Sequence, residues 1–86
     1  MPCVSRFFGI SIYFYYNDHN PPHFHAKYQG QDGVFEIATL ALIEGAAAPR
    51  VRALVVEWGA KHLPELMAAW EQCRRGEEPG AIPPLE

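Results

Sequence analysis

The apolar side chains change their spacing part-way along this chain, and that change restricts the fold more than any other feature. Between residues 4 and 43, apolar and polar positions mostly alternate, as expected for strands whose two faces differ. From Val51 to Cys73 the apolar positions recur every three or four residues, which is typical of helices packed on a core. Strands followed by helices predict the α+β class.

Four strands are expected in the first half, over residues 4–16, 23–28, 34–38 and 39–43. The better core face of the first strand is the set of Val4, Phe8, Ile10, Ile12 and Phe14, with Arg6 as an exception near the strand start. Gly9, in the middle of this strand, indicates a bulge or a close backbone approach. Residues 17–22 have the composition of a turn. Residues 29–33 are expected to close a hairpin with a loop of four residues or slightly more.

Two helices are expected in the second half. Pro49 suits the first turn of the first helix, whereas Pro64 must break that helix and start the second, because its ring clashes with the preceding turn. Gly76 is a suitable residue just beyond the second helix. Trp58 and Trp70 lie on the apolar stripes and are expected in the core. The prediction is a mainly antiparallel sheet of about four strands with both C-terminal helices on one face.

With 86 residues, nearly half of them apolar, the chain is expected to form a single domain over residues 1–86. Its only long apolar run is interrupted and too short to span a bilayer, so a cytoplasmic protein is expected. Cys3 and Cys73 are isolated and are expected to be reduced thiols. Ile82 and Leu85 indicate that the Pro-rich tail packs against the domain.

The net charge of −3 is unevenly distributed. Residues 1–30 contain two basic and one acidic side chain, a balance of +1, and residues 31–86 contain five basic and nine acidic side chains, a balance of −4. Tight non-specific binding to nucleic acid needs many Lys and Arg contacts with phosphate. A broad nucleic-acid surface is therefore excluded, and any contact with RNA or DNA is expected to be local and N-terminal.

Three of the four histidines fall within seven residues, beside two prolines. On a strand, one face carries His23, His25 and Lys27, and the opposite face carries Phe24, Ala26 and Tyr28. The second set suits the core. The first set is therefore expected to project outward, with Glu36 beside it and opposite Lys27 or His25.

This face supports two kinds of chemistry. His23 and His25 could bind one metal ion, and His19 or Asp18 could complete a zinc-type site with an open position. Alternatively, metal-free acid–base hydrolysis of RNA or another phosphoester needs a base, an acid and a cation. The candidate catalytic residues for that reaction are His23, His25, Lys27, Arg6 and Tyr15.

Two further interpretations involve no chemistry. A sheet face with Tyr13, Tyr15 and Lys27 would suit a binding protein, because aromatic rings and cations bind single-stranded RNA and also occur at protein interfaces. Alternatively, the histidines beside the Pro-rich turn could cap backbone groups and pack the loop. His62, on the apolar side of its helix, is expected to be structural.

Three segments carry a resemblance to a known family: Val4-Ser5-Arg6-Phe7-Phe8-Gly9-Ile10, Tyr15-Tyr16-Asn17-Asp18-His19 and Pro22-His23-Phe24-His25-Ala26. They resemble the bacterial family catalogued as domain of unknown function 4160, and the likeness extends over nearly the whole chain. The chain departs from the usual family pattern at two junctions, residues 46–49 and Pro64. The family's motif positions are matched by Arg6, Asp18, His19, His23 and His25, as site candidates only.

The resemblance implies a small bacterial protein that is often encoded beside another small protein, as in toxin–antitoxin pairs. The leading hypothesis is accordingly a binding or regulatory protein of such a two-gene module, acting through the His/Tyr/Lys face. Its expected partner is the protein encoded by the neighbouring gene, and RNA or DNA is a further possible partner. The alternative is a metal-dependent or metal-free hydrolase that acts on RNA or a phosphoester.

Overall fold

The computed structural model describes residues 1–86 and contains one antiparallel sheet followed by two helices. The strands are β1 (Cys3–Phe7), β2 (Ile10–Tyr13), β3 (His23–Tyr28), β4 (Gln31–Glu36) and β5 (Leu42–Gly45), and the helices are α1 (Pro49–Lys61) and α2 (Leu63–Arg74). Strand order in the sheet follows chain order. The predicted α+β class, with an antiparallel sheet and two C-terminal helices, is confirmed, although the sheet has five strands.

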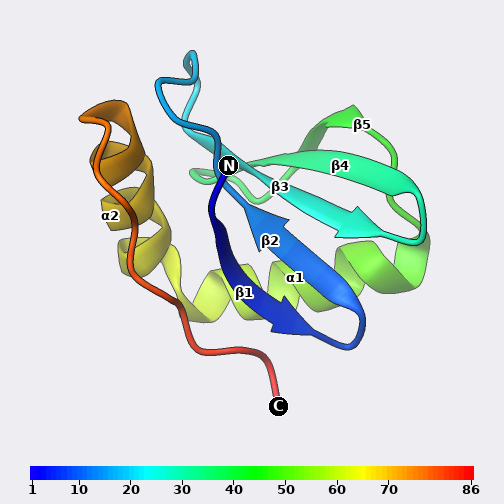
Figure 1. The fold of residues 1–86 in the computed structure, drawn as a ribbon. Coiled ribbons are helices and arrows are strands. Elements are labelled where there is room, and N and C mark those ends of the chain that lie inside the picture. The colour runs from blue at the N-terminus through cyan, green and yellow to red at the C-terminus, as the bar shows by residue number, and fades with distance from the viewer.

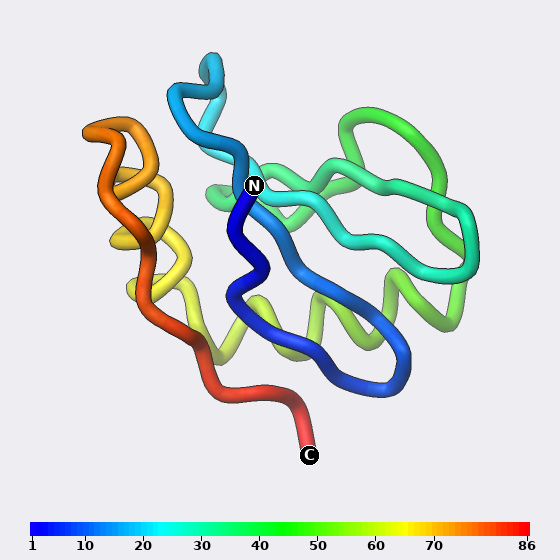
Figure 2. Tube along the Cα trace, viewed as in Figure 1, coloured from blue at the N-terminus to red at the C-terminus, as the bar shows by residue number.

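The helices lie differently against the sheet (Figures 1 and 2). Helix α1 runs across one face of the sheet, whereas α2 turns away at residue 62 and stands beside the strand ends where β3 begins. The core lies between the sheet and the helices, and Trp58 and Trp70 are both buried there, as predicted. The opposite sheet face, which we call the histidine face, carries His23, His25 and Lys27.

The single strand expected over residues 4–16 is in fact a hairpin. Phe8 and Gly9 both have positive φ values, 49° and 80°, and form the turn between β1 and β2. Gly9 therefore marks a turn and not a bulge. The turn also shifts the side-chain pattern, so that Phe7 is buried and Phe8, which was expected in the core, is exposed.

The hairpin between β3 and β4 is tighter than expected. Tyr28 pairs with Gln31, so the loop contains only Gln29 and Gly30, whose φ values of 45° and 82° match a two-residue turn. Asp32, which was expected in the turn, is therefore a strand residue.

The shorter loop also corrects the register across the hairpin. Lys27 is opposite Asp32, and Glu36 is opposite His23, not opposite Lys27 or His25 as expected. The next strand is shifted as well, because residues 37–39 form a turn and β5 begins only at Leu42.

The helix boundaries follow the sequence signals. Pro49 begins α1, His62 separates the two helices, and Pro64 lies in the first turn of α2. Gly76 has a φ value of 73° beyond α2. The Gly76 N–H donates to the Cys73 carbonyl, and the Glu77 N–H donates to the Gln72 carbonyl. These two bonds together form a Schellman cap.

The C-terminal tail packs against the domain, as predicted. The Ile82 N–H donates to the Val4 carbonyl of β1 at 2.8 Å, and the indole Nε1–H of Trp58 donates to the Pro83 carbonyl at 2.8 Å. Ile82 and Leu85 are both buried. The tail therefore covers the β1 edge of the sheet. Neither helix has the length and apolar character needed to cross a bilayer.

Three glycines provide a test of the tight contact between β4 and β5. A Cβ atom on Gly45 would overlap the Asp32 carbonyl oxygen, and this glycine also has a φ value of 76°. Gly76 also has a positive φ value, but a Cβ atom there would meet no neighbouring atom. Gly80 has neither a positive φ value nor a close neighbour. In urea unfolding, we expect Gly80→Ala to be nearly neutral, Gly76→Ala to cost about 1 kcal/mol, and Gly45→Ala to cost about 3 kcal/mol. Equal losses for Gly45→Ala and Gly76→Ala would contradict the close approach.

Candidate functional site

The loop between β2 and β3 folds over the start of the histidine face. The Asn17 N–H donates to the Cys73 carbonyl near the end of α2 at 3.1 Å, and the Ile37 N–H donates to the Pro22 carbonyl at 3.0 Å. These bonds tie the loop to α2 on one side and to the end of β4 on the other. Asp18, in the middle of the loop, is thereby held over β3.

His23 is the more deeply buried of the two β3 histidines. Its side chain is only 5% exposed, and its ring lies 5.1 Å from the ring of Trp70, measured between centroids. Nδ1 lies 2.7 Å from the Pro21 carbonyl oxygen. Because a carbonyl only accepts, Nδ1 carries a proton. The other nitrogen, Nε2, lies 2.8 Å from Oδ2 of Asp18.

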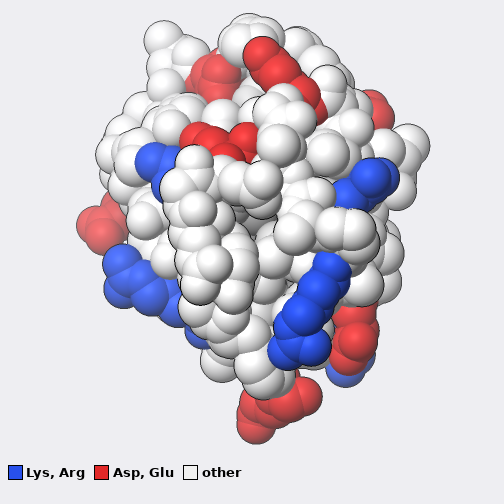
Figure 3. Space-filling view, turned by 90° about the vertical axis from the view of Figure 1, so that its right-hand side faces the viewer, with Lys and Arg blue, Asp and Glu red and all other residues white.

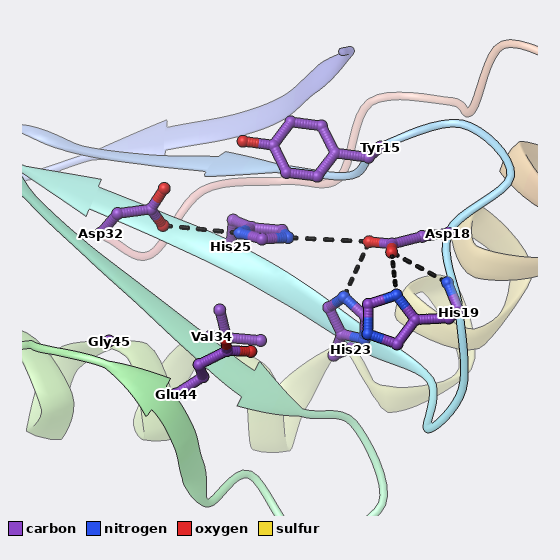
Figure 4. A pocket seen from close by; sticks show the side chains of 9 residues that line it. All are labelled: Tyr15, Asp18, His19, His23, His25, Asp32, Val34, Glu44 and Gly45. Atoms are coloured by element: carbon purple, nitrogen blue, oxygen red, sulfur yellow. Dashed lines mark hydrogen bonds and ion pairs between the residues drawn. The ribbon is translucent and has the colours of Figure 1, made fainter.

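His25 lies in line between two carboxylates (Figure 4). Its Nε2 is 3.8 Å from Oδ2 of Asp18, and its Nδ1 is 3.5 Å from Oδ1 of Asp32. The ring packs beside Tyr15, with 4.3 Å between centroids. Both ring nitrogens are shielded from solvent and neither forms a hydrogen bond. Leaving a buried polar group without a hydrogen bond costs free energy, and a ligand bound between these groups would supply the missing partner.

Asp18 connects all three neighbouring histidines. Its Oδ1 accepts the backbone N–H of His19 at 2.8 Å and lies 3.0 Å from Nδ1 of that residue, while Oδ2 faces His23 and His25. Burial alone raises the pKa of Asp18. The His19 backbone bond and the His23 and His19 imidazoles outweigh it, so the pKa falls below its ordinary value of 3.8.

The donor set fits a small divalent metal ion. One ligand atom from each of Asp18, His23 and His25 lies within 4.8 Å of the others. Zinc held at about 2.1 Å by tetrahedral ligands would separate the ligand atoms by about 3.4 Å. The Oδ2–Nε2 distances of 2.8 and 3.8 Å fall on either side of this value. Small side-chain movements would therefore complete the geometry.

The cluster forms part of the wall of an open hollow of about 370 Å³, which we call the first hollow. Its lining consists of Tyr15, Asp18, His19, His23, His25, Asp32, Val34, Glu44 and Gly45. His19 is 84% exposed and lies at the rim. A molecule entering from solvent could thus reach a metal ion held by the three ligands, of which His23 is buried and Asp18 and His25 are partly buried.

The profile of the family described as Domain of unknown function (DUF4160) matches residues 9–71. The chain belongs to this family. The comparisons with curated proteins and with solved structures gave no match. For this DUF4160 domain, the geometry of the cluster therefore carries the functional argument.

The structure divides the candidate residues of the DUF4160 domain into two groups. Asp18, His19, His23, His25 and Tyr15 come together around the first hollow. Lys27 and Arg6 do not line it. The Lys27 ammonium lies over the Tyr13 ring, 5.0 Å from its centroid, and Arg6 is exposed on β1.

The expectation of two outward-facing, open histidines needs correction. Phe24 is buried in the core, and His23 and His25 do lie on the opposite face. However, the β2–β3 loop, Tyr15 and Trp70 cover them, so His23 is buried and His25 is nearly so. The capping alternative holds in part, because His23 does bond to the Pro21 carbonyl.

Sequence reasoning missed two acidic members of the site, Asp32 and Glu44. Asp32 faces His25 only because the β3–β4 loop contains two residues. Glu44 reaches the site because β5 pairs with β4, where it lies opposite Val34. A tight turn at Gln29-Gly30 was the one sequence signal that could have placed Asp32 beside the histidines.

The lowered pKa of Asp18 predicts a dependence of stability on pH. A carboxylate with a depressed pKa in the folded state stabilises the fold above its unfolded pKa, near 3.8, and this contribution disappears as pH falls through the folded value. Asp18→Asn should therefore cost about 1–3 kcal/mol near neutral pH, and the loss should shrink below pH 3.8. Urea unfolding across this range provides the measurement.

Glu57→Gln is the matched control for this comparison, because Glu57 is exposed on α1 and makes only a 4.0 Å pair with Lys61. It should change stability little at any pH. A loss for Asp18→Asn that stayed constant down to the most acidic conditions would show that its charge does not stabilise the fold.

Proposed function

We propose that this protein binds a divalent transition metal, such as zinc, and uses it to hydrolyse a phosphoester. The observation that carries the proposal is the convergence of two imidazole Nε2 atoms on one carboxylate oxygen of Asp18. This arrangement favours the hydrolase over the open binding face, because His23 and His25 lie in a covered recess.

The outer contacts of the imidazoles also favour a metal site. Metal-binding histidines usually donate their second N–H to a carbonyl or a carboxylate, which fixes the ring and leaves the other nitrogen free to bind. His23 does this through Pro21, and Nδ1 of His25 faces Asp32. Both rings therefore direct Nε2 toward the same point.

In the metal-free protein, His23 and Asp18 form a hydrogen-bonded pair that must hold one proton between Nε2 and Oδ2. A metal ion would replace that proton, because ligating nitrogen must offer its lone pair. Nε2 of His23 and Oδ2 of Asp18 thus share a proton in the metal-free protein and would share the ion in the metal-bound protein.

A tetrahedral ion held by two imidazoles and one carboxylate would keep a fourth position for water or substrate, and the three residues that would hold it line the first hollow. A bound metal supplies a polarised water and a positive charge beside the phosphoryl oxygens. Hydrolysis adds the water oxygen to phosphorus and breaks one phosphorus–oxygen ester bond. The departing alkoxide takes up a proton, and the second water proton is lost to solvent.

Calorimetric titration with zinc tests the metal site. We expect one ion per chain. His25→Gln should weaken binding at least about 100-fold, and Asp32→Asn, which removes only an outer contact, should weaken it about tenfold. His62→Gln is the control, because His62 bonds to Glu65 away from the cluster. Equal affinity in the wild type and His25→Gln would refute the site.

Turnover of bis(p-nitrophenyl) phosphate, followed by absorbance in the presence of zinc or manganese, tests the reaction. The wild-type protein should release p-nitrophenol, and both His25→Gln and removal of the metal with a chelator should abolish the release. Metal bound stoichiometrically without any turnover would contradict the hydrolase while leaving the metal site in place.

We also propose a protein partner as a second function, because one sheet edge is uncovered. The tail covers β1, whereas β5 has no neighbour beyond it and exposes Ile43. An extended strand of the protein encoded by the neighbouring gene could pair there. Ile43→Lys should prevent co-elution with that protein, and Val56→Lys, at an exposed site on α1, should not. Co-elution with both variants would exclude the β5 edge.

A further inference from the structure

A second hollow opens on the histidine face beside the first. It measures about 460 Å³ and lies at the turn end of the β3–β4 hairpin. Its lining consists of Gly9, Ser11, Lys27, Tyr28, Gln29, Gly30, Gln31 and Asp32. Asp32 lines both hollows, so they are neighbours. The polar side chains of the second hollow are one ammonium, two hydroxyls, two carboxamides and the carboxylate of Asp32.

Lys27 is the only basic residue that lines the second hollow, Asp32 is the only acidic one, and the two form no ion pair. Asp32 is directly opposite Lys27 in the sheet, but its Oδ1 faces His25 instead. The ammonium lies over the Tyr13 ring, which holds it in place without neutralising it. Lys27 is therefore available for an anion.

A second cation lies in the same row of the sheet. Ser11 on β2 pairs with Arg6 on one side and with Lys27 on the other. Directly paired residues of antiparallel strands project from the same face. Arg6 thus projects from the same face two strands from Lys27, outside the lining of the second hollow, and adds positive charge to this side of the sheet.

The positions of His25 and Lys27 suit a chain of phosphates. Both residues project from the histidine face, and the Lys27 ammonium lies over Tyr13, the direct partner of His25 on β2. The Cα atoms of His25 and Lys27 are about 6.8 Å apart along the extended strand. That is close to the separation of successive phosphates in an extended nucleic-acid strand. A phosphate at the metal cluster would place its neighbour near the ammonium of Lys27.

We propose that the substrate is a short single-stranded oligonucleotide, with its scissile phosphate at the Asp18–His23–His25 cluster and the adjoining phosphate on Lys27. This assignment rests on the proposed hydrolase function and specifies its substrate class. Lys27 is a substrate-binding residue here and touches no reacting atom.

The charges near both hollows favour a short substrate over a long one. Asp18, Asp32 and Glu44 line the first hollow without any Lys or Arg, so a phosphate needs a bound cation to enter it. In the second hollow Asp32 is the only acidic residue and Lys27 is present beside it, so a phosphate can bind there without a metal. Beyond these sites, acidic and basic side chains form small separate groups on the face shown in Figure 3. Since that face has no continuous basic track, additional phosphates lying on it gain little.

The test compares two dinucleotides that differ only in a terminal phosphate next to the scissile linkage, in ribose and deoxyribose versions. For the zinc-loaded wild type, we expect the terminal phosphate to raise kcat/KM about tenfold. Lys27→Gln should remove this preference, and Lys27→Arg should restore most of it. Lys61→Gln, at an exposed lysine on α1, should keep it. A preference that survives in Lys27→Gln, or none in the wild type, overturns the proposal.

A binding measurement separates this proposal from the hydrolase itself. In ¹H–¹⁵N spectra of the metal-free protein, the phosphorylated dinucleotide should shift the amides of Ser11, Lys27 and Gln31 in the wild type. Those shifts should disappear in Lys27→Gln, whose other resonances show that it is folded. This result without turnover would retain the phosphate subsite and reject hydrolysis. Shifts that do not depend on Lys27 would reject the subsite.

Discussion

The site depends on the bond between the Asn17 N–H and the Cys73 carbonyl, because this contact fastens the β2–β3 loop to α2. A loop with two consecutive prolines has few backbone donors of its own, so anchors elsewhere in the fold must hold it. Once held, it presents Asp18 to two imidazoles that the pleat of β3 directs to the same side. The helices, which carry none of the three ligands, thus determine whether the ligands meet.

Much of the fold follows from local patterns in the sequence. Helical spacing and prolines at residues 49 and 64 locate both helices, and alternation around Phe24 assigns the core side of β3. These signals succeed because each depends on neighbours within one turn or one pleat. Local patterns were sufficient to predict the fold class, the buried tryptophans and the packed tail.

The errors in the first strand and in the β3–β4 register share one physical cause, which is that tight turns can form without their usual residues. Phe8 and Gln29 adopt positive φ, although such residues rarely do, and each is followed by a glycine. The first turn splits an apparently continuous strand, and the second sets the register across β3 and β4. Alternation continues across the first turn and conceals it, whereas the second turn lies within residues 29–33 as expected but contains only two residues.

The burial of His23 and His25 could not be predicted from the residues near them in the sequence. The sequence identifies His23 and His25 as a pair on one face, but their cover comes from distant parts of the chain, notably Tyr15 and Trp70. The same is true of Asp32, which reaches His25 only through the register of the hairpin. Sequence reasoning thus named the ligands but not the environment that makes them a recessed cluster.

The packing of Trp70 against His23 has an optical consequence. An indole with its centroid 5.1 Å from an imidazole experiences any change in the charge of that ring. The emission of Trp70 should therefore respond when a cation or a proton arrives at the cluster. Trp58 lies instead beside His62, 5.6 Å between ring centroids, and its emission should respond to events at the helix junction. The chain thus contains its own fluorescent reporter of the cluster, without an added label.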